Sequence, residues 1–163
     1  MPNPQEIVTN TSPIIGIVAA LGNLDVLQIY SRVLVPKEVS DEISVEMSGR
    51  FAATEFEAAL WLDKQRQYQS ISLQLQNSLD IGEAAVIQCA LSNNITTVCI
   101  DETMGRRFAR LNGLNVTGSI GVLLRAKREG YEFSMKNAID KMRSHGIWLS
   151  QNIIQLALEQ AGE

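Results

Sequence analysis

Short runs of β-prone residues alternate with helical patterns along most of this chain, and this alternation restricts the possible folds more than any other feature. The runs are EIVT at residues 6–9, RVLV at 32–35, SISL at 70–73, TTVCI at 96–100 and NVT at 115–117. Such alternation is typical of βαβ units, whose strands pair in parallel. The chain is therefore predicted to have an α/β fold, with TTVCI as a central strand.

Helix-start and helix-stop residues divide the segments between these runs. Ser12-Pro13 favours a helix that ends at Leu21-Gly22, and Asp80-Ile-Gly-Glu83 resembles a capping box. Helices are predicted over residues 13–21, 24–30, 37–47, 54–67, 80–92, 103–111, 119–129, 135–144 and 151–160. The last two belong to a segment, about residues 132–163, that we expect to be a helical addition to the α/β core.

The length of 163 residues favours one domain, because two cores would leave too few residues for each. Apolar residues make up 45% of the chain and charged residues 20%, which excludes a disordered chain. The longest apolar run, at residues 14–21, is too short to span a membrane, and no secretory signal is visible. We therefore expect a cytoplasmic protein with no membrane contact.

Several common chemistries have no sequence support. The GSIG segment that begins at Gly118 matches neither the dinucleotide nor the P-loop fingerprint, and no serine lies in a G-x-S-x-G elbow. Cys89 and Cys99 lack zinc-binding spacing, so we predict that both are buried thiols.

The formal net charge of −4 conceals an uneven distribution. Residues 1–101 hold 5 basic and 12 acidic side chains, whereas residues 102–163 hold 9 basic and 6 acidic ones. Two interpretations remain open. Either the two portions separate metal binding from phosphate binding, or they form two ordinary solvated surfaces.

Acidic and amide side chains fall where a parallel sheet binds its ligands. Asn10 follows the first predicted strand, Asp101 and Glu102 follow the fourth, and Glu42 and Glu83 lie early in two helices. In such sheets, ligands bind beyond the carboxyl ends of the strands, where the strand order reverses. We therefore expect these five side chains to converge on one cleft.

Carboxylates gathered in one cleft repel each other. Each pair at a separation of ~5 Å costs about 3 kcal/mol at an effective dielectric constant near 20, so the cluster requires a cation or shared protons. No Lys, Arg or His lies within three residues of Asn10, Glu83 or Asp101 in the sequence. Oxygen ligands without His or Cys select hard ions, so we expect Mg²⁺ or Mn²⁺. Phosphodiester hydrolysis is a reaction that such ions support.

Each of these residues also has an ordinary structural explanation. In this explanation, Glu83 would complete a capping box with Asp80, and Asp101 would cap the following helix. Glu42 would be a solvated helix residue, and Asn10 would be a turn residue. Taken one at a time, the residues leave these explanations open, but their order along the chain is more informative.

A resemblance to a known family rests on this order. Its segments are Ile7-Val-Thr-Asn10-Thr-Ser-Pro, Val35-Pro-Lys-Glu-Val-Ser-Asp-Glu42-Ile, Leu79-Asp-Ile-Gly-Glu83-Ala-Ala and Ile100-Asp101-Glu102-Thr, with Gly105-Arg-Arg, GSIGVLLRAK from Gly118 and GIWLS from Gly146. Together they resemble the PIN-domain superfamily, and more narrowly a bacterial branch related to the VapC-type toxin ribonucleases. The resemblance extends from about residue 6 to 155.

The resemblance implies a three-layer α/β/α sandwich around a central parallel sheet, with a metal-dependent endoribonuclease site. Glu42 would occupy the second acidic position, Glu83 the third, and Asp101 or Glu102 the fourth. We assign catalysis to Glu42, Glu83 and Asp101. All four carboxylates are candidate metal ligands.

The first position departs from the pattern of the superfamily. Relatives usually have Asp after the first strand, whereas this chain has Asn10. The amide carbonyl of Asn10 can still coordinate Mg²⁺ or Mn²⁺, but it removes one negative charge and predicts weaker metal binding. Ser12 is expected to support this shell.

The resemblance also implies partners: an RNA substrate, a small antitoxin that blocks the cleft, and a homodimer formed through exposed apolar residues on the early helices. Arg106, Arg107 and Arg110 follow the fourth acidic position and either contact RNA phosphates or form a solvated helix face. Two other functions compete with the nuclease. One is an RNA- or protein-binding module that Asn10 has deprived of turnover, and the other is a structural adaptor that uses the C-terminal helices.

Overall fold

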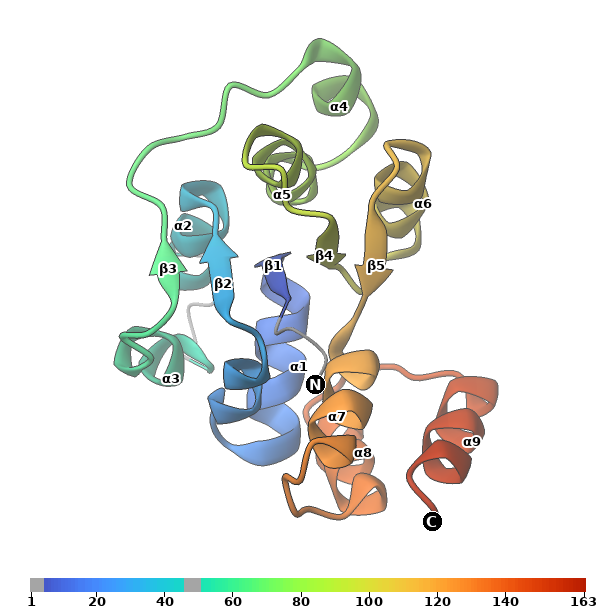
Figure 1. Ribbon diagram of the computed structural model, residues 1–163. Coiled ribbons are helices and arrows are strands. Elements are labelled where there is room, and N and C mark those ends of the chain that lie inside the picture. Colours follow the sequence, from blue (N-terminus) through green and yellow to red (C-terminus); the bar gives the residue numbers. More distant parts are fainter. Residues whose placement is uncertain (1–4, 46–50) are drawn as a thin grey trace.

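The computed structural model describes residues 5–45 and 51–163. Within these ranges the strands form one parallel sheet in the order β3-β2-β1-β4-β5 (Figure 1). The strands are β1 (Glu6–Thr9), β2 (Arg32–Val35), β3 (Asp63–Lys64), β4 (Thr97–Cys99) and β5 (Asn115–Thr117). The central strand β1 places Ile7 opposite Val33 of β2 and Val8 opposite Val98 of β4. These residues are buried, as expected of a parallel sheet covered on both faces.

Helices cover both faces of this sheet. In Figure 1, α5 and α6 lie on one side, and α1, α7 and α8 pack together on the other. The helices are α1 (Thr11–Leu21), α2 (Lys37–Val45), α3 (Ala53–Ala58), α4 (Leu73–Ser78), α5 (Ile81–Ser92), α6 (Thr103–Leu111), α7 (Ser119–Arg128), α8 (Met135–Ser144) and α9 (Gln151–Gln160), with the 3-10 helix η1 (Asp25–Ile29) after α1. The α/β/α sandwich is confirmed. None of the helices in the described ranges is long and apolar enough to cross a membrane.

The segment between β2 and α5 differs from the prediction. Residues 70–72 are irregular, so the predicted strand SISL is wrong, and β3 at Asp63–Lys64 pairs with β2 instead. Ser72 accepts a hydrogen bond from the backbone N–H of Leu75 and thereby begins α4, and Leu73 is 74% exposed. Three of the four residues of this run are exposed and Ile71 is intermediate, so the run has no buried face to hold it in a sheet. The helix predicted over 54–67 is also too long, because α3 ends at Ala58.

The other elements follow the sequence pattern closely. The predicted helix over 37–47 corresponds to α2, which is described as far as Val45; its last two predicted positions lie outside the described residues. Cys89 and Cys99 are fully buried, as predicted, and burial raises the pKa of the Cys89 thiol to about 11.

The helix α8 belongs to the main core. Met135, Ala138, Ile139 and Met142 are buried in the same hydrophobic cluster as the strands, and α8 packs against α1. The apolar residues of α8 therefore form part of the layer that covers the sheet. The following helix, α9, is more peripheral, because Ala157 is its one residue in the buried class.

The strand order reverses between β1 and β4, the two neighbours at the centre of the sheet. The chain continues from β1 into α1 on one side and from β4 into α6 on the other. The backbone N–H of Asn10 donates to the carbonyl of Cys99 at 3.0 Å, so the carboxyl ends of the two strands lie together. This is the place where an open parallel sheet binds ligands.

Candidate functional site

The segments that follow β1 and β4 meet in one cluster of polar side chains. Asn10 is the N-cap of α1, and its Nδ2 donates to Oε2 of Glu102 at 3.3 Å. Ser12, in the first turn of α1, donates from Oγ to Oε1 of Glu102. The Glu102 carboxylate is thus held from two sides by residues about ninety positions earlier in the chain.

The helix α2 adds Glu42 to the same cluster. Oε2 of Glu42 accepts a hydrogen bond from Oγ1 of Thr11 at 2.9 Å. Gly82, in the first turn of α5, permits this approach: a Cβ at Gly82 would lie 2.9 Å from Oε2 of Glu42 and 3.2 Å from Oδ1 of Asn10. Segments following β1 and β2 and the start of α5 therefore converge at one point, and a side chain at Gly82 would fill it.

The next residue of α5, Glu83, is the most deeply placed carboxylate of the cluster. It is 6% exposed, and its Oε2 has no hydrogen-bond partner among the described residues. Gly105 of α6 faces this oxygen so closely that a Cβ there would clash with it. A buried carboxylate oxygen without a partner is costly, and a bound cation or proton removes that cost.

The electrostatics of Glu83 follow from this placement. Burial is the largest effect, a hydrogen bond with the Asp80 side chain is the next, and the charges of Asp80, Glu102 and Glu42 add to them, so the pKa of Glu83 rises to about 8. The metal-free cluster therefore holds a proton at neutral pH. Mutual repulsion of the carboxylates requires either a cation or a shared proton, and in the metal-free protein the proton meets this requirement.

Asp101 takes a different direction from Glu102. Its Oδ1 accepts a hydrogen bond from the backbone N–H of Ser119 at 2.8 Å and lies against Gly118. It thereby satisfies a free N–H at the start of α7, a role that the sequence suggested for the start of α6. Gly118 is the N-cap of α7. Of the Asp101-Glu102 pair, it is Glu102 whose carboxylate contacts Asn10 and Ser12.

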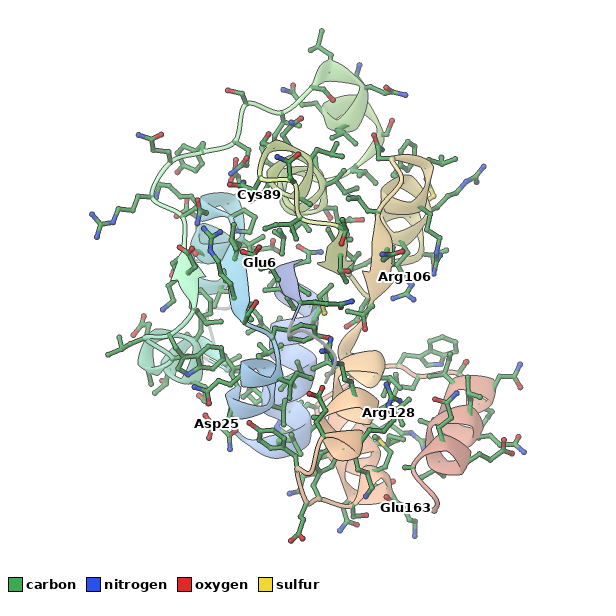
Figure 2. All side chains as sticks on the ribbon, in the orientation of Figure 1. Glu6, Asp25, Cys89, Arg106, Arg128 and Glu163 are labelled. Atoms are coloured by element: carbon green, nitrogen blue, oxygen red, sulfur yellow. The ribbon has the colours of Figure 1, made fainter. Side chains whose placement is uncertain are left out.

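The three arginines of α6 have two different environments. Nη1 of Arg106 donates to the backbone carbonyl of Ile100 at 2.8 Å, and Figure 2 shows Arg106 beside the end of β5 and the approach to α7. This guanidinium stabilises the loop that carries Asp101. Arg107 and Arg110 are exposed, and at a spacing of three residues they share the outer face of α6.

Comparison with known proteins gives a family. A family model described as a PIN domain matches residues 6–163, nearly the whole chain. The chain belongs to the PIN-domain family. No curated protein and no solved structure gives a significant match.

PIN domains generally use divalent metals, and this PIN domain contains an oxygen donor set that suits a hard ion. Within residues 5–45 and 51–163, however, no three His, Cys, Asp or Glu side chains already stand at metal-binding spacing. Glu42 and Glu102 are held by hydroxyl and amide donors, while Glu83 retains the oxygen without a partner. These residues fit a divalent ion, although among the described residues the carboxylates of the metal-free protein are not already placed at metal-binding spacing.

An acidic groove of about 830 Å³ adjoins the cluster in this PIN domain. Four carboxylates line it, and apolar side chains and two glutamines form most of its other walls: Glu38, Asp41, Glu42 and Asp80, with Tyr68, Ile71, Leu79, Ile81, Gln69 and Gln76. Glu38 is 7% exposed, and its Oε2 accepts a hydrogen bond from the backbone N–H of Gln69 at 2.8 Å.

The sequence did not point to Thr11 or Glu38. The one available signal for Glu38 is its position one helical turn before Glu42, which places both on the same face of α2. Thr11 gave no signal of its own beyond its position directly after Asn10. Asp80 was noted only as a cap, a role that it does fill, because its Oδ1 accepts the backbone N–H of Glu83 at 2.9 Å.

Proposed function

We propose that this PIN domain is a metal-dependent endoribonuclease that hydrolyses RNA phosphodiester bonds. The observation that supports it best is the buried oxygen of Glu83, which lacks a partner in a cluster containing Glu42, Glu102 and Asn10. No Lys, Arg or His lies within three residues of Asn10 or Glu83 in the sequence, and a divalent ion would supply the counter-charge that these carboxylates need.

In this proposal Glu42, Glu83 and Glu102 hold Mg²⁺ or Mn²⁺, and the Oδ1 atom of Asn10 completes the shell. Thr11 and Ser12 position the carboxylates of Glu42 and Glu102 by the hydrogen bonds that they donate. Glu102, rather than Asp101, takes the fourth acidic position. We assign to Asp101 the support of α7 through Ser119, which differs from its expected catalytic role.

A divalent ion held there supplies the Lewis acidity that activates a water molecule and offsets charge on the phosphate. The protein provides the rest. Glu83 gives up its proton when the ion binds, because an adjacent cation stabilises the carboxylate form. The Gly82 and Gly105 positions leave space beside Glu42 and Glu83 that side chains would otherwise fill.

The test is cleavage of a circular RNA, which an endonuclease opens and an exonuclease leaves intact. We expect cleavage by the wild-type protein with Mn²⁺, none with EDTA, and a loss of at least about 100-fold in the rate for Glu83→Gln, as removal of a key catalytic group typically gives. Glu132→Gln is the matched control, because Glu132 is exposed and lies outside the cluster. Its activity should equal that of the wild type.

The competing function has its own signature in the same assay. Asn10 leaves the cluster one charge short of a full acidic set, which favours an RNA- or protein-binding module without turnover. In that case wild type and Asn10→Asp both bind RNA and leave it uncut. Cleavage that depends on Mn²⁺ and on Glu83 excludes this alternative.

The finer biological role follows from the resemblance to the VapC-type branch. We propose that the protein acts as the toxin of a toxin–antitoxin pair and forms a homodimer. We expected the interface on the early helices, but among the described residues the large exposed apolar side chains of the helices lie on α4, α5, α6 and α9, for example Leu73, Ile81 and Met104. Sedimentation of the wild type and of Leu73→Glu tests the dimer, since the charge should yield monomers.

A further inference from the structure

The connection between α8 and α9 is short and fixed at both ends. Gly146 has a φ of +83°, and the following N–H of Ile147 donates to the carbonyl of Met142 at 3.1 Å. At the other end, Oγ of Ser150 accepts the backbone N–H of Ile153 and caps α9. The intervening residues 147–149 are therefore held in place by two helix ends.

One aromatic side chain of this connection faces solvent. Ile147 and Leu149 are half-buried and pack against the hydrophobic core, whereas Trp148 between them is 83% exposed. An indole ring is large and mostly apolar, and in proteins it is usually well buried. The packing of its two neighbours holds Trp148 outward on a rigid segment.

This connection adjoins the acidic cluster. The side chain of Ile147 lines a cavity of about 260 Å³ together with Ser12, Asp101 and Glu102. Figure 1 shows the same segment passing the beginning of α7 on its way to α9. Trp148 is thus one residue away from a wall of the cavity that contains the Glu102 carboxylate.

Charge indicates the side from which a polyanion reaches the cluster. The groove on the side of α2 and the start of α5 is lined by Glu38, Asp41 and Asp80, which repel phosphates. The outer face of α6 carries the exposed Arg107 and Arg110. A strand that contacts these arginines avoids the acidic groove and approaches the cluster from the side where β4 leads into α6.

We propose that Trp148 stacks against an unpaired nucleobase of an RNA strand whose phosphodiester bond lies at the acidic cluster. This inference rests on the proposed function and adds a substrate class to it, because only a base outside a duplex can expose its face to the indole. Stacking tolerates every base. Trp148 therefore selects single-stranded RNA without selecting its sequence.

Binding measured in EDTA tests this contact without cleavage. With a labelled single-stranded RNA of about 12 nucleotides, Trp148→Ala should bind on the order of ten-fold more weakly than wild type, the usual effect of removing one stacking partner. Trp148→Phe keeps an aromatic face and should bind close to the wild-type level. Leu156→Ala removes another exposed apolar side chain, 48% exposed on α9, and should have no effect. A blunt RNA duplex should bind equally to all four proteins.

Tryptophan fluorescence gives a direct readout. The chain has two tryptophans, so Trp61→Phe leaves Trp148 as the sole reporter, and single-stranded RNA should quench its emission. Equal RNA affinity of wild type and Trp148→Ala, or no quenching, overturns the proposal. A change confined to the sedimenting mass of Trp148→Ala also overturns it, in favour of a protein interface.

The outcome for Trp148 is separable from that for the nuclease. If wild type cuts RNA with Mn²⁺, Trp148→Ala should raise KM on the order of ten-fold and leave kcat nearly unchanged. Cleavage with an unaltered KM rejects the stacking contact and keeps the nuclease. Weaker RNA binding by Trp148→Ala, with no cleavage by any variant, rejects the nuclease and keeps the stacking contact.

Discussion

Asn10 donates to Glu102 with an N–H group that an aspartate at the same position would lack. This amide stabilises the metal-free cluster, because it links a carboxylate to a neutral donor instead of adding another negative charge. An aspartate would repel Glu42 and Glu102, although it would offer a stronger ligand to a cation. In the proposed metal site, the residue at position 10 would therefore set the balance between the stability of the metal-free protein and its affinity for the metal.

The substitution Asn10→Asp is predicted to shift this balance. The melting temperature in EDTA should fall by several degrees, because about 1–2 kcal/mol of stability is lost to repulsion. Mn²⁺ affinity should increase roughly ten-fold, as an added charge of this kind gives. Calorimetric unfolding and metal titration measure the two quantities, with Asn152→Asp on the exposed part of α9 as control. An unchanged Mn²⁺ affinity would contradict the placement of residue 10 in the metal shell.

Glu83 makes stability depend on pH. Its pKa is about 8 in the folded metal-free protein and near 4.5 when unfolded, so folding takes up a proton between these values. The free energy of unfolding in EDTA should therefore decrease as the pH rises from about 5 to 8. Glu83→Gln removes this uptake, and its stability should vary less over the same interval. Guanidinium unfolding of wild type and Glu83→Gln at pH 5.5 and 8 measures this pH dependence. The same pH dependence in both proteins would refute the raised pKa of Glu83.

Elements whose own pattern enforces burial or capping could be predicted from the sequence. The runs at residues 6–9, 32–35, 96–100 and 115–117 correspond to β1, β2, β4 and β5, although β4 is shorter. β3 could not be found in this way. It is a two-residue edge strand in which Asp63 pairs with Arg32 at 2.7 Å, a contact made only after β2 is in place.

The candidate site shows the same division. Placement at strand ends and in the first turns of helices predicted that Asn10, Glu42 and Glu83 approach one another, although Glu42 lies in the second turn of α2. It did not distinguish Asp101 from Glu102, because the choice depends on the Ser119 N–H, which lies 18 residues further along the chain. Side-chain direction at a strand end is thus decided by a partner that a local pattern does not contain.

The terminal turn after α9 is linked to α8 by Glu163. Its carboxylate accepts hydrogen bonds from the backbone N–H groups of Met135 and Lys136 and from the side chains of Ser134 and Lys127. Figure 2 shows Glu163 beside α8. These contacts, led by the Met135 N–H, lower the pKa of Glu163 to about 2. The carboxylate thereby caps the beginning of α8 from outside that helix.

Glu163→Gln is predicted to loosen this link in a pH-dependent way. The pKa of Glu163 is lower in the folded state, so its stabilisation is complete above about pH 4.5 and disappears as the pH falls toward 2. At pH 7 the variant should melt at a lower temperature than wild type and exchange its α8 amides faster. Near pH 2 the two proteins should coincide. A constant difference at every pH would show that packing, rather than the charge, makes the link.

On the scale of the whole molecule, the acidic cluster lies between two surfaces of opposite character. The groove beside α2 carries Glu38, Asp41 and Asp80, and the outer face of α6 carries Arg107 and Arg110. The uneven charge along the chain is consistent with this arrangement, because the first group precedes residue 102 and the second follows it.

RNA binding should therefore depend on salt through α6. Each phosphate contact to a single strand contributes about 0.7 to the slope of log affinity against log salt concentration. Arg107→Gln should lower that slope by about this amount. Arg66→Gln, at the exposed end of the opposite sheet edge, should leave it unchanged. Equal slopes for all three proteins would show that the strand does not cross α6.

The pairing of β1 with β4 also has a temporal consequence. Glu102 is made more than ninety residues after Asn10, and the two meet only when β4 has joined the sheet. A growing chain that ends before this point has no complete set of ligands. In the proposed function, a nascent domain therefore cannot hold the metal until the segment that carries β4 and Glu102 has been made and has joined the sheet.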